Sequence, residues 1–317
     1  MLLTLAPLAG YTDLPYRRIV SRFGPDEVTT EMVSIRALYY GDEKTRRYLL
    51  RHEEEAPTRL QIFGDDPEMM AEVIHRELND HDEFIGLDLN VGCPAPKIVK
   101  SGAGSALLCD LPRLRRMIRL AVKASDKPLS VKIRKGFQED TFGLEAAFFA
   151  EEEGASHLTV HGRTRQMYYE GEADWSFIEE VARRVSIPVL GNGDVTSAED
   201  VKRHMTSGLL AGVAIGRGAI GNPWIFQEIR QGLRGDEVKA PKLSELFSIV
   251  FDHLDLACAY YGEYKGIREM RKHLMGYTKH LPEAARLRRD LNRFESREEV
   301  VAYLKDYLKT YEEGLFT

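Results

Sequence analysis

The sequence has few cysteines and no long apolar run, and both shortages argue against whole classes of protein. Its three cysteines, Cys93, Cys109 and Cys258, are widely spaced and odd in number, which disfavours a disulfide framework and indicates a reducing compartment. No stretch approaches the roughly 18 consecutive apolar residues of a membrane helix, and the first ten residues lack the basic lead of a signal peptide. We therefore expect a cytoplasmic protein with no membrane association.

The chain as a whole also lacks an excess of positive charge, with 44 Lys and Arg residues against 50 acids. The formal net charge is −6, so no overall positive field attracts nucleic acid. Residues 265–293 are the exception, with nine Lys and Arg residues against three acids. A basic run is usually a solvated helix face. Here it covers two expected helices with His273, Tyr277 and His280 interleaved, so a surface for a phosphate backbone fits it equally well.

Short β-rich runs alternate with segments of helical period through the first three quarters of the chain. The expected strands are residues 2–8, 27–33, 58–63, 84–91, 129–134, 157–161, 187–191 and 212–216. The expected helices between them include 66–78, 111–125, 143–154, 176–185 and 197–205. Eight β-then-α periods, with strands too apolar to face water, predict an α/β fold: a closed (β/α)8 TIM barrel over residues 1–230.

The pattern changes after residue 230. Residues 231–242 are polar and contain Gly and Pro, which is typical of a linker. Helical segments follow at 243–261, 265–281, 284–294 and 296–311 with no strand between them. We expect a small all-α bundle domain over residues 243–317.

Strands 7 and 8 of the expected barrel end in glycine-rich turns. In a TIM barrel the working residues follow the C-terminal ends of the strands. The turns G191-N-G-D194 and G216-R-G-A-I-G221 offer backbone N–H groups that suit a phosphate. The second turn also matches G-x-G-x-x-G, a weak signal here because it closes the eighth strand instead of opening a doubly wound unit. Glycines required only for close packing are the alternative.

Other strand ends carry side chains whose meaning depends on their partners. Lys132 and Arg134 point to one face of the fifth strand, where an unpaired lysine is costly unless an anion meets it. A buried pair of Lys132 with Glu31 is the alternative. His161 alone is more typical of a hydrogen-bonded strand histidine. His157 has no third ligand at a suitable spacing, so we expect no metal site.

Cys93 follows the fourth strand between Gly92 and Pro94. Taken alone, it is either a small residue filling a tight corner or a reactive group at the mouth of a pocket. No histidine lies near it in the sequence to activate it as a nucleophile.

Six ordered motifs resemble the tRNA-dihydrouridine synthase family, most closely its B-type bacterial branch. They are A6-P-L-A-G-Y-T-D13, N90-V-G-C-P94 with G102-A-G-S-A-L-L108, S130-V-K-I-R134, H161-G-R-T164, G191-N-G-D194 and G216-R-G-A-I-G-N-P-W-I-F226. The similarity continues at R268-E-M-R-K-H273 and A284-A-R-L-R-R-D-L-N-R293. Leu8 stands where the family commonly has Met, a residue of similar volume.

The resemblance implies a flavoprotein oxidoreductase, with FMN as cofactor and NADPH as reductant, that reduces the C5=C6 bond of specific uridines in tRNA. Reduced FMN gives a hydride to C6, and Cys93 gives a proton to C5. A free thiol is mostly protonated at neutral pH and can serve as that acid. The FMN-binding residues that the resemblance implies are Pro7, Leu8, Ala9, Gln61, Lys132, His161, Asn192, Gly193, Asp194, Gly216 and Arg217.

The remaining candidates concern the RNA. Asn90 and Arg134 are expected to contact the uracil or its phosphate. The basic helical segment gives four candidates for gripping the tRNA backbone while the base leaves its stack: Arg268, Arg271, Lys272 and Arg288. tRNA is the expected partner, no protein partner is implied, and we expect a monomer. Cys109 and Cys258 are assigned to packing.

Three other functions stay open at this point. An FMN barrel acting on a small molecule, as a dihydroorotate- or enone-type oxidoreductase does, is disfavoured by the basic helical segment and the Cys93 motif. A phosphosugar isomerase or lyase barrel would use the strand 7 and 8 phosphate site without a flavin. An RNA-binding protein that has lost activity is disfavoured by the presence of Cys93 and Lys132.

Overall fold

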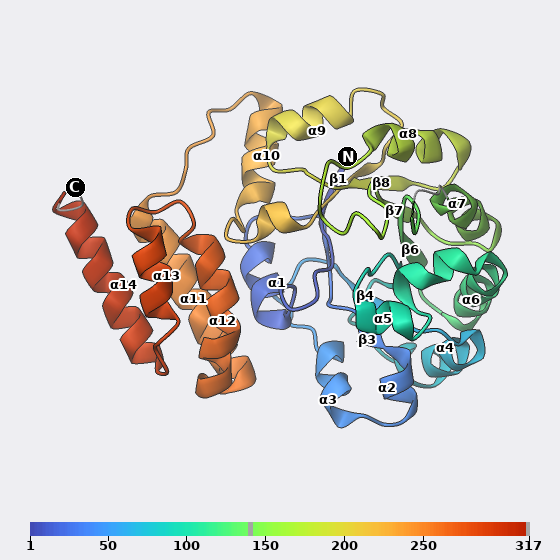
Figure 1. Cartoon of the computed structure of the whole chain (residues 1–317), viewed down its shortest axis with the longest axis horizontal. Helices are drawn as coiled ribbons and strands as arrows, with labels where there is room; N and C mark the ends of the chain where they lie inside the picture. Colours follow the sequence, from blue (N-terminus) through green and yellow to red (C-terminus); the bar gives the residue numbers. More distant parts are fainter. Residues whose placement is uncertain (139–141, 315–317) are drawn as a thin grey trace.

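The computed structural model describes residues 1–138 and 142–314 and contains a parallel barrel with a helical domain beside it (Figure 1). The strands are β1 (Leu2–Leu5), β2 (Glu27–Thr29), β3 (Val33–Ser34), β4 (Thr58–Phe63), β5 (Gly86–Val91), β6 (Leu129–Arg134), β7 (Leu158–His161), β8 (Val189–Asn192) and β9 (Gly212–Ile215). The sheet closes because β9 pairs with β1, and β2 pairs with both β1 and β4. The predicted (β/α)8 barrel is confirmed, with β2 and β3 together filling its second strand position.

Two expected strands differ from the structure in physically informative ways. Strand β1 ends at Leu5, not at residue 8, because the chain turns at Pro7, which has no N–H to donate to a neighbouring strand. The expected strand 27–33 is interrupted at residues 30–32. There Glu31 turns away to accept the Gly10 N–H at 2.5 Å, which ties this break to the loop after β1.

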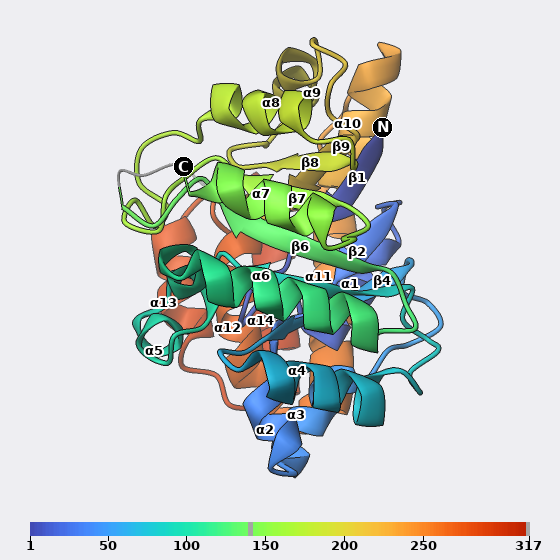
Figure 2. The ribbon, with the colours of Figure 1, turned by 90° about the vertical axis from the view of Figure 1, so that its right-hand side faces the viewer.

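Helices surround the barrel (Figure 2). They are α1 (Leu14–Ser21), α2 (Ile35–Tyr39), α3 (Glu43–Arg46), α4 (Pro67–Val73), α5 (Pro96–Lys100), α6 (Leu111–Ala124), α7 (Gly143–Glu152), α8 (Trp175–Arg184), α9 (Ala198–His204) and α10 (Ile225–Arg234). The expected cap of α9 is present, since the Ser197 hydroxyl accepts the Asp200 N–H at 3.2 Å. Helix α10 runs to Arg234, so residues 231–234 of the expected linker are helical.

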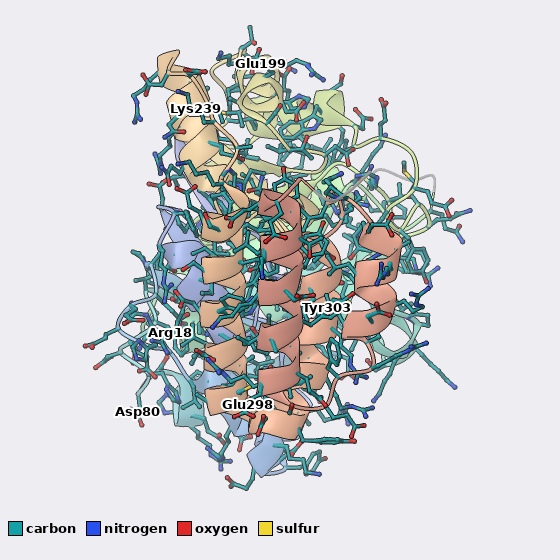
Figure 3. The ribbon with its side chains drawn as sticks, turned by 90° about the vertical axis from the view of Figure 1, so that its left-hand side faces the viewer. Arg18, Asp80, Glu199, Lys239, Glu298 and Tyr303 are labelled. Carbon is teal, nitrogen blue, oxygen red and sulfur yellow. The ribbon has the colours of Figure 1, made fainter. Side chains whose placement is uncertain are left out.

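The C-terminal domain contains α11 (Leu243–Tyr261), α12 (Glu263–Tyr277), α13 (Ala284–Leu291) and α14 (Arg297–Glu312). Figure 3 views this domain from the side away from the barrel, with Glu298 and Tyr303 of α14 labelled. Its own apolar core includes Phe247, Val250 and Leu304, each at most 1% exposed. Among the helices of residues 1–138 and 142–314, none is long and apolar enough to cross a membrane.

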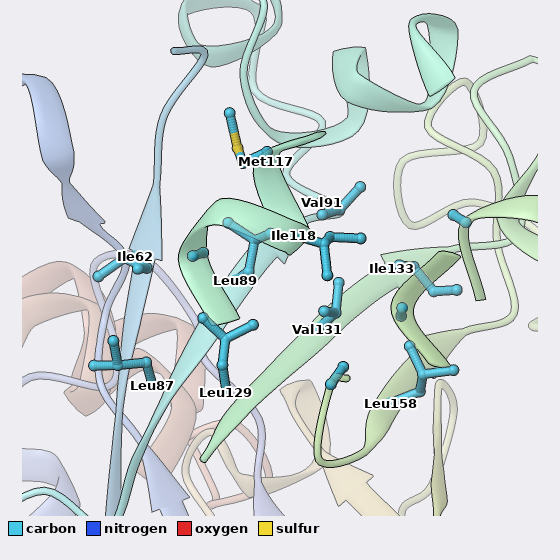
Figure 4. Packing of buried hydrophobic residues seen from close by; sticks show 14 of the residues in the cluster. Ile62, Leu87, Leu89, Val91, Met117, Ile118, Leu129, Val131, Ile133 and Leu158 are labelled. Atoms are coloured by element: carbon cyan, nitrogen blue, oxygen red, sulfur yellow. The ribbon is translucent and has the colours of Figure 1, made fainter. Parts of the chain in front are cut away.

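The period of two along each strand separates an apolar outer face from a polar interior. Leu89 and Val131 point outward and pack with Met117 and Ile118 of α6 (Figure 4). Each such buried side chain contributes roughly 1.5–3 kcal/mol relative to exposure. Residues of the opposite parity, Asp88 among them, point into the barrel. The apolar packing therefore holds the wall, and the interior is left for polar groups.

The helical domain packs against α1 and the loops at the barrel mouth. The Tyr261 hydroxyl donates to Asp13 at 2.9 Å, and the Tyr260 hydroxyl donates to the Arg47 carbonyl at 2.9 Å. His273 and Tyr277 are 1% and 4% exposed in this region. The interpretation of these two residues as part of a phosphate-facing surface is therefore wrong, because their helix turns that face toward the barrel.

Candidate active site at the barrel mouth

The C-terminal ends of the strands converge on one cavity of about 410 Å³. Every barrel residue singled out from the sequence as catalytic, cofactor-binding or substrate-binding lines it: Pro7, Leu8, Ala9, Gln61, Asn90, Cys93, Lys132, Arg134, His161, Asn192, Gly193, Asp194, Gly216 and Arg217. The four helical-domain candidates, Arg268, Arg271, Lys272 and Arg288, lie outside it. The structure thus brings the barrel residues together and leaves the basic helical residues apart.

Strand register explains why these side chains meet. In neighbouring strands Asn90 lies opposite Lys132, and Arg134 lies opposite His161. His161 in turn lies opposite Asn192. Because partners in a parallel ladder share a face of the sheet, all of these side chains point into the barrel at similar heights.

The loop that carries Cys93 is fixed from both sides. The Asn90 side-chain oxygen accepts the N–H groups of Gly92 and Cys93, at 3.2 and 2.9 Å. The Cys93 carbonyl accepts the Ser105 N–H and hydroxyl, at 3.1 and 2.9 Å. Gly104 has φ +59°, and a Cβ there would lie 3.0 Å from the Cys93 carbonyl oxygen. The G102-A-G-S segment therefore packs directly beneath Cys93.

Burial raises the pKa of the half-buried Cys93 thiol above its ordinary value, although Arg134 and Lys132 act in the opposite direction. A raised thiol pKa keeps the proton on sulfur at neutral pH. Cys93 is therefore suited to give a proton and poorly suited to act as a thiolate nucleophile.

A buried chain of hydrogen bonds orients Asn90. The Asp88 carboxylate accepts the Ser130 hydroxyl and the Gln61 side-chain N–H, each at 2.7 Å. The Gln61 oxygen then accepts the Asn90 side-chain N–H at 2.9 Å. Because its own N–H is directed toward Gln61, Asn90 turns its oxygen toward the Cys93 loop.

Lys132 extends into the cavity, and among residues 1–138 and 142–314 no carboxylate bonds to its ammonium group. Its Nζ donates to the Asn192 side-chain oxygen at 3.2 Å, and Asn192 donates to the Ala214 carbonyl at 2.6 Å. The alternative partner, Glu31, accepts the Gly10 N–H instead. Burial and the nearby Arg134 lower the pKa of Lys132 to about 8. An anion in the cavity would offset the free-energy cost of keeping the buried Lys132 ammonium group charged.

The turns after β8 and β9 form a cationic corner. Asp194 accepts Arg163 Nη2 at 2.7 Å, Arg217 Nη2 at 3.3 Å and the Ala173 N–H at 2.8 Å. Gly193 has φ +131°, and a Cβ there would lie 2.5 Å from Ala173 Cβ, so this turn requires glycine. Of the residues that the structure describes, Asp194 is the one carboxylate lining the cavity, against four cationic residues: Lys132, Arg134, Arg217 and Lys279. The donor set fits an anionic group.

Comparisons with known proteins agree with this arrangement. The profile of the family described as Dihydrouridine synthase (Dus) matches residues 4–312. The chain belongs to the dihydrouridine synthase family. It is 38% identical over 307 residues to tRNA-dihydrouridine synthase B of Pseudomonas aeruginosa, covering 96% of this chain and 92% of that protein. It is also 37% identical over 291 residues to a probable tRNA-dihydrouridine synthase of Rickettsia bellii, covering 91% and 89% of the two chains.

In this dihydrouridine synthase family member, Arg134 connects three loops at the mouth. Its guanidinium donates to the carbonyls of Gly92 at 2.8 Å, Thr164 at 2.8 Å and Tyr168 at 2.9 Å. Arg134 therefore holds the Cys93 loop against the loop after β7. His161, 6% exposed, is kept neutral because burial lowers its pKa well below the ordinary value.

Three functional candidates were not assigned from the sequence. Arg163, 2% exposed, holds Asp194 in place, and it could have been found as a strand-end residue of the H161-G-R-T164 motif. The Tyr169 ring lies 4.7 Å from the Arg217 guanidinium carbon, in a loop that no periodicity marks. Lys279 enters the cavity from the helical domain. Its position depends on how the two domains pack, which the sequence pattern does not encode.

The basic residues of the helical domain have mixed surroundings. Lys272 bonds to Glu269 at 2.5 Å and lines a second cavity of about 330 Å³, beside Glu31 and Tyr261. Arg271 Nη2 donates to the Phe294 carbonyl at 3.2 Å. Arg268 is exposed and Arg288 is partly exposed. These side chains are thus partly engaged within the domain, and each keeps some contact with solvent.

Proposed function

We propose that this chain is an FMN- and NADPH-dependent tRNA-dihydrouridine synthase. The observation that carries the proposal is the convergence of Cys93, Lys132 and the cationic corner at Arg217 on one cavity. Two independent requirements of the reaction, an anchored phosphate-bearing cofactor and a protonated acid, are then met at one place. The names of the relatives supply the substrate, a uridine of tRNA.

The cavity fits FMN in two respects. Its cationic corner, with backbone amides at Gly193, Gly216 and Arg217, suits the phosphate. The adjoining wall, from Ala6 to Ala9 at the end of the neighbouring strand β1, is largely apolar and suits the ring system. Gln61, Lys132 and His161 also line this cavity, and we propose them as polar contacts for the ring. When bound, FMN supplies the hydride that adds to C6 of uracil, and NADPH restores it.

Cys93 gives the proton that completes the reduction. As C6 gains a hydride, the C5=C6 π electrons form a new bond from C5 to the Cys93 proton, leaving a thiolate that is reprotonated from solvent. The raised pKa of Cys93 favours the protonated form before each turnover. Arg134 and Lys132, both near Cys93, stabilise the thiolate that follows.

Two other site residues position the Cys93 loop and the substrate. Asn90 and Arg134 position the loop of Cys93, and we propose that both also contact the uracil or its phosphate. A uridine inside RNA must leave its stack to enter this cavity.

We propose residues 1–230 as the FMN-binding catalytic domain, residues 231–242 as the connection and residues 243–317 as the domain that grips tRNA through Arg268, Arg271, Lys272 and Arg288. We further propose a monomer acting in the cytoplasm.

Cys93→Ala tests the central assignment. The variant should retain FMN and be reduced by NADPH at the wild-type rate, because the thiol serves neither step. Dihydrouridine formation should fall by roughly 10²–10⁴-fold, the usual contribution of a positioned general acid. Cys109 is exposed, so its assignment to packing is wrong; because it also lies outside the cavity, Cys109→Ala is the matched control.

Two measurements on the same samples separate the proposals. Flavin absorbance and its bleaching by NADPH report the cofactor, and mass spectrometry of the tRNA reports the product. Normal product from Cys93→Ala would contradict the acid role. A protein that never binds flavin would instead support a phosphosugar-type barrel enzyme.

A further inference from the structure

Three buried side chains meet where the helical domain packs on the barrel. Asp13 is the N-cap of α1, His253 lies in α11 and His273 lies in α12. One ligand atom of each lies within 4.8 Å of the others. Their exposures are 5%, 1% and 1%. The cluster lies apart from the cavity of Cys93 and takes no part in the proposed reaction.

The two imidazoles have ring nitrogens without hydrogen-bond partners among the described residues. These are His253 Nε2 and both nitrogens of His273. Buried polar atoms are nearly always satisfied, so three in one cluster indicate a missing partner. These unpartnered nitrogens belong to the two histidines that cluster with Asp13. In an ordinary polar contact between domains they would instead be hydrogen-bonded.

Neighbouring groups already orient two of the three side chains. His253 Nδ1 lies 3.1 Å from the Tyr277 hydroxyl. When Nδ1–H donates to that oxygen, Nε2 keeps its lone pair for another partner. Asp13 Oδ1 accepts the Tyr16 N–H at 3.0 Å, and Oδ2 accepts the Tyr261 hydroxyl at 2.9 Å. A carboxylate with two such bonds still has lone pairs to offer. Hydrogen bonds of this kind behind the ligands are typical of metal sites.

We propose that Asp13, His253 and His273 bind one divalent transition-metal ion of the Zn²⁺ class. Two imidazoles and a carboxylate are ligands that Zn²⁺ accepts, with a fourth position left for water. The geometry requires only modest closure. At the 4.8 Å limit, the centre of the triangle is about 2.8 Å from each atom, so each moves inward by about 0.7 Å to reach a Zn–N distance of 2.0–2.1 Å.

The site would have a structural role. Asp13 belongs to the barrel and both histidines to the helical domain, so the ion would clamp the proposed tRNA-gripping domain to the catalytic barrel. Lys272, the nearby cation on α12, is occupied by Glu269 and leaves the carboxylate of Asp13 for the metal. Because the ion binds only the folded arrangement of both domains, its binding should raise the unfolding temperature.

Cobalt titration of the full chain tests the proposal. Protein stripped with a chelator should take up one Co²⁺ per chain, with visible d–d bands and no sulfur-to-cobalt charge transfer. Zn²⁺ should displace the cobalt and, at a hundredfold excess over its Kd, raise the unfolding midpoint by about 4 °C. Asp13→Asn and His273→Gln should each abolish the spectrum, and His280→Gln, at an exposed histidine, should leave it unchanged.

The outcomes are distinguishable even if one variant fails to fold. Circular dichroism identifies the folded variants. One folded variant, either Asp13→Asn or His273→Gln, is enough to test whether the cobalt spectrum depends on this cluster. Wild-type protein that takes up no stoichiometric cobalt overturns the proposal. Charge transfer from a cysteine, or binding retained in a folded variant, places the metal elsewhere and also overturns it. None of these results depends on dihydrouridine formation.

Discussion

Lys132 gives the sharpest test of whether the cavity is built for an anion. In the flavin-free protein no such anion is bound, so the buried ammonium group should lower the free energy of unfolding. Burial lowers its pKa from 10.5 to about 8. A difference of 2.5 units corresponds to about 3 kcal/mol against the charged form, at about 1.4 kcal/mol per unit. Lys132→Met removes that penalty but also the hydrogen bond to Asn192, worth about 1 kcal/mol. The variant should therefore be more stable at pH 7 by about 2 kcal/mol.

The pH dependence follows from the direction of the shift. Below pH 8 Lys132 is charged in both folded and unfolded protein, so the full penalty applies. Between pH 8 and 10.5 the folded protein releases its proton first, the unfolded state binds more protons, and the stability of the wild type rises with pH. The advantage of the variant should shrink over that interval and reverse by about 1 kcal/mol above it, where only the lost hydrogen bond remains.

Urea denaturation of the flavin-free proteins at pH 7, 9 and 10.5 measures these differences. Lys123→Met, at an exposed lysine on α6, is the control and should change neither the stability nor its pH dependence. The Lys132 variant should also lose flavin more readily than the wild type. A variant that is destabilised at pH 7, or whose advantage is independent of pH, would refute the reasoning that Lys132 is retained for a ligand.

Two further predictions concern the Cys93 loop and the RNA surface. Gly104→Ala should lower the free energy of unfolding by about 1–3 kcal/mol and impair dihydrouridine formation more than flavin reduction, because the added Cβ meets the Cys93 carbonyl. Gly208→Ala is the control in the same thermal and product assays. Gly208 has φ +67° and no atom within 4 Å of the added Cβ, so this variant should show only the cost of the backbone conformation. Replacing Arg271, Lys272 and Arg288 by Gln should weaken tRNA binding and reduce the slope of log Kd against log salt by up to about 2–3, and an unchanged slope would return these residues to an ordinary solvated face.

The barrel and most of its cavity could be predicted because their signals are local. Buried parallel strands are short apolar runs, and the residue just past each run lies at the same edge of the sheet. That argument placed Lys132, Arg134 and Gly193 together without knowledge of any contact. It could not decide the alternative pairing of Lys132 with Glu31, which the structure excludes because the strand breaks at residues 30–32 and the Glu31 carboxylate accepts the Gly10 N–H. A break of this kind depends on a hydrogen bond to a residue 21 positions away.

The helical domain was predicted in its helices but not in its orientation. Its four segments carry the 3.6-residue period of a bundle, so their existence and approximate positions follow from the sequence, although α12 ends at Tyr277 instead of residue 281 and α13 at Leu291 instead of residue 294. The sequence does not show which polar face of the bundle meets the barrel, because that depends on the shape and chemistry of the barrel surface. His273 therefore passed for one of several polar residues in a basic run, although it is 1% exposed beside His253. The Asp13 cluster joins residues 240 and 260 positions apart, beyond the reach of any local pattern.

The contact between the two domains bears directly on the proposed reaction. The backbones of Gly221 and Gly276 touch, and a Cβ on Gly221 would overlap the Gly276 carbonyl group. Gly221 ends the turn that begins at Gly216 and Arg217, and Lys279 lies three residues beyond Gly276 and lines the same cavity. The two glycines thus allow the helical domain close enough to add a cation to the cavity. Lys279 of the helical domain thus joins the cations that the barrel supplies, so the helical domain contributes to the cavity besides the grip on tRNA that we propose for it.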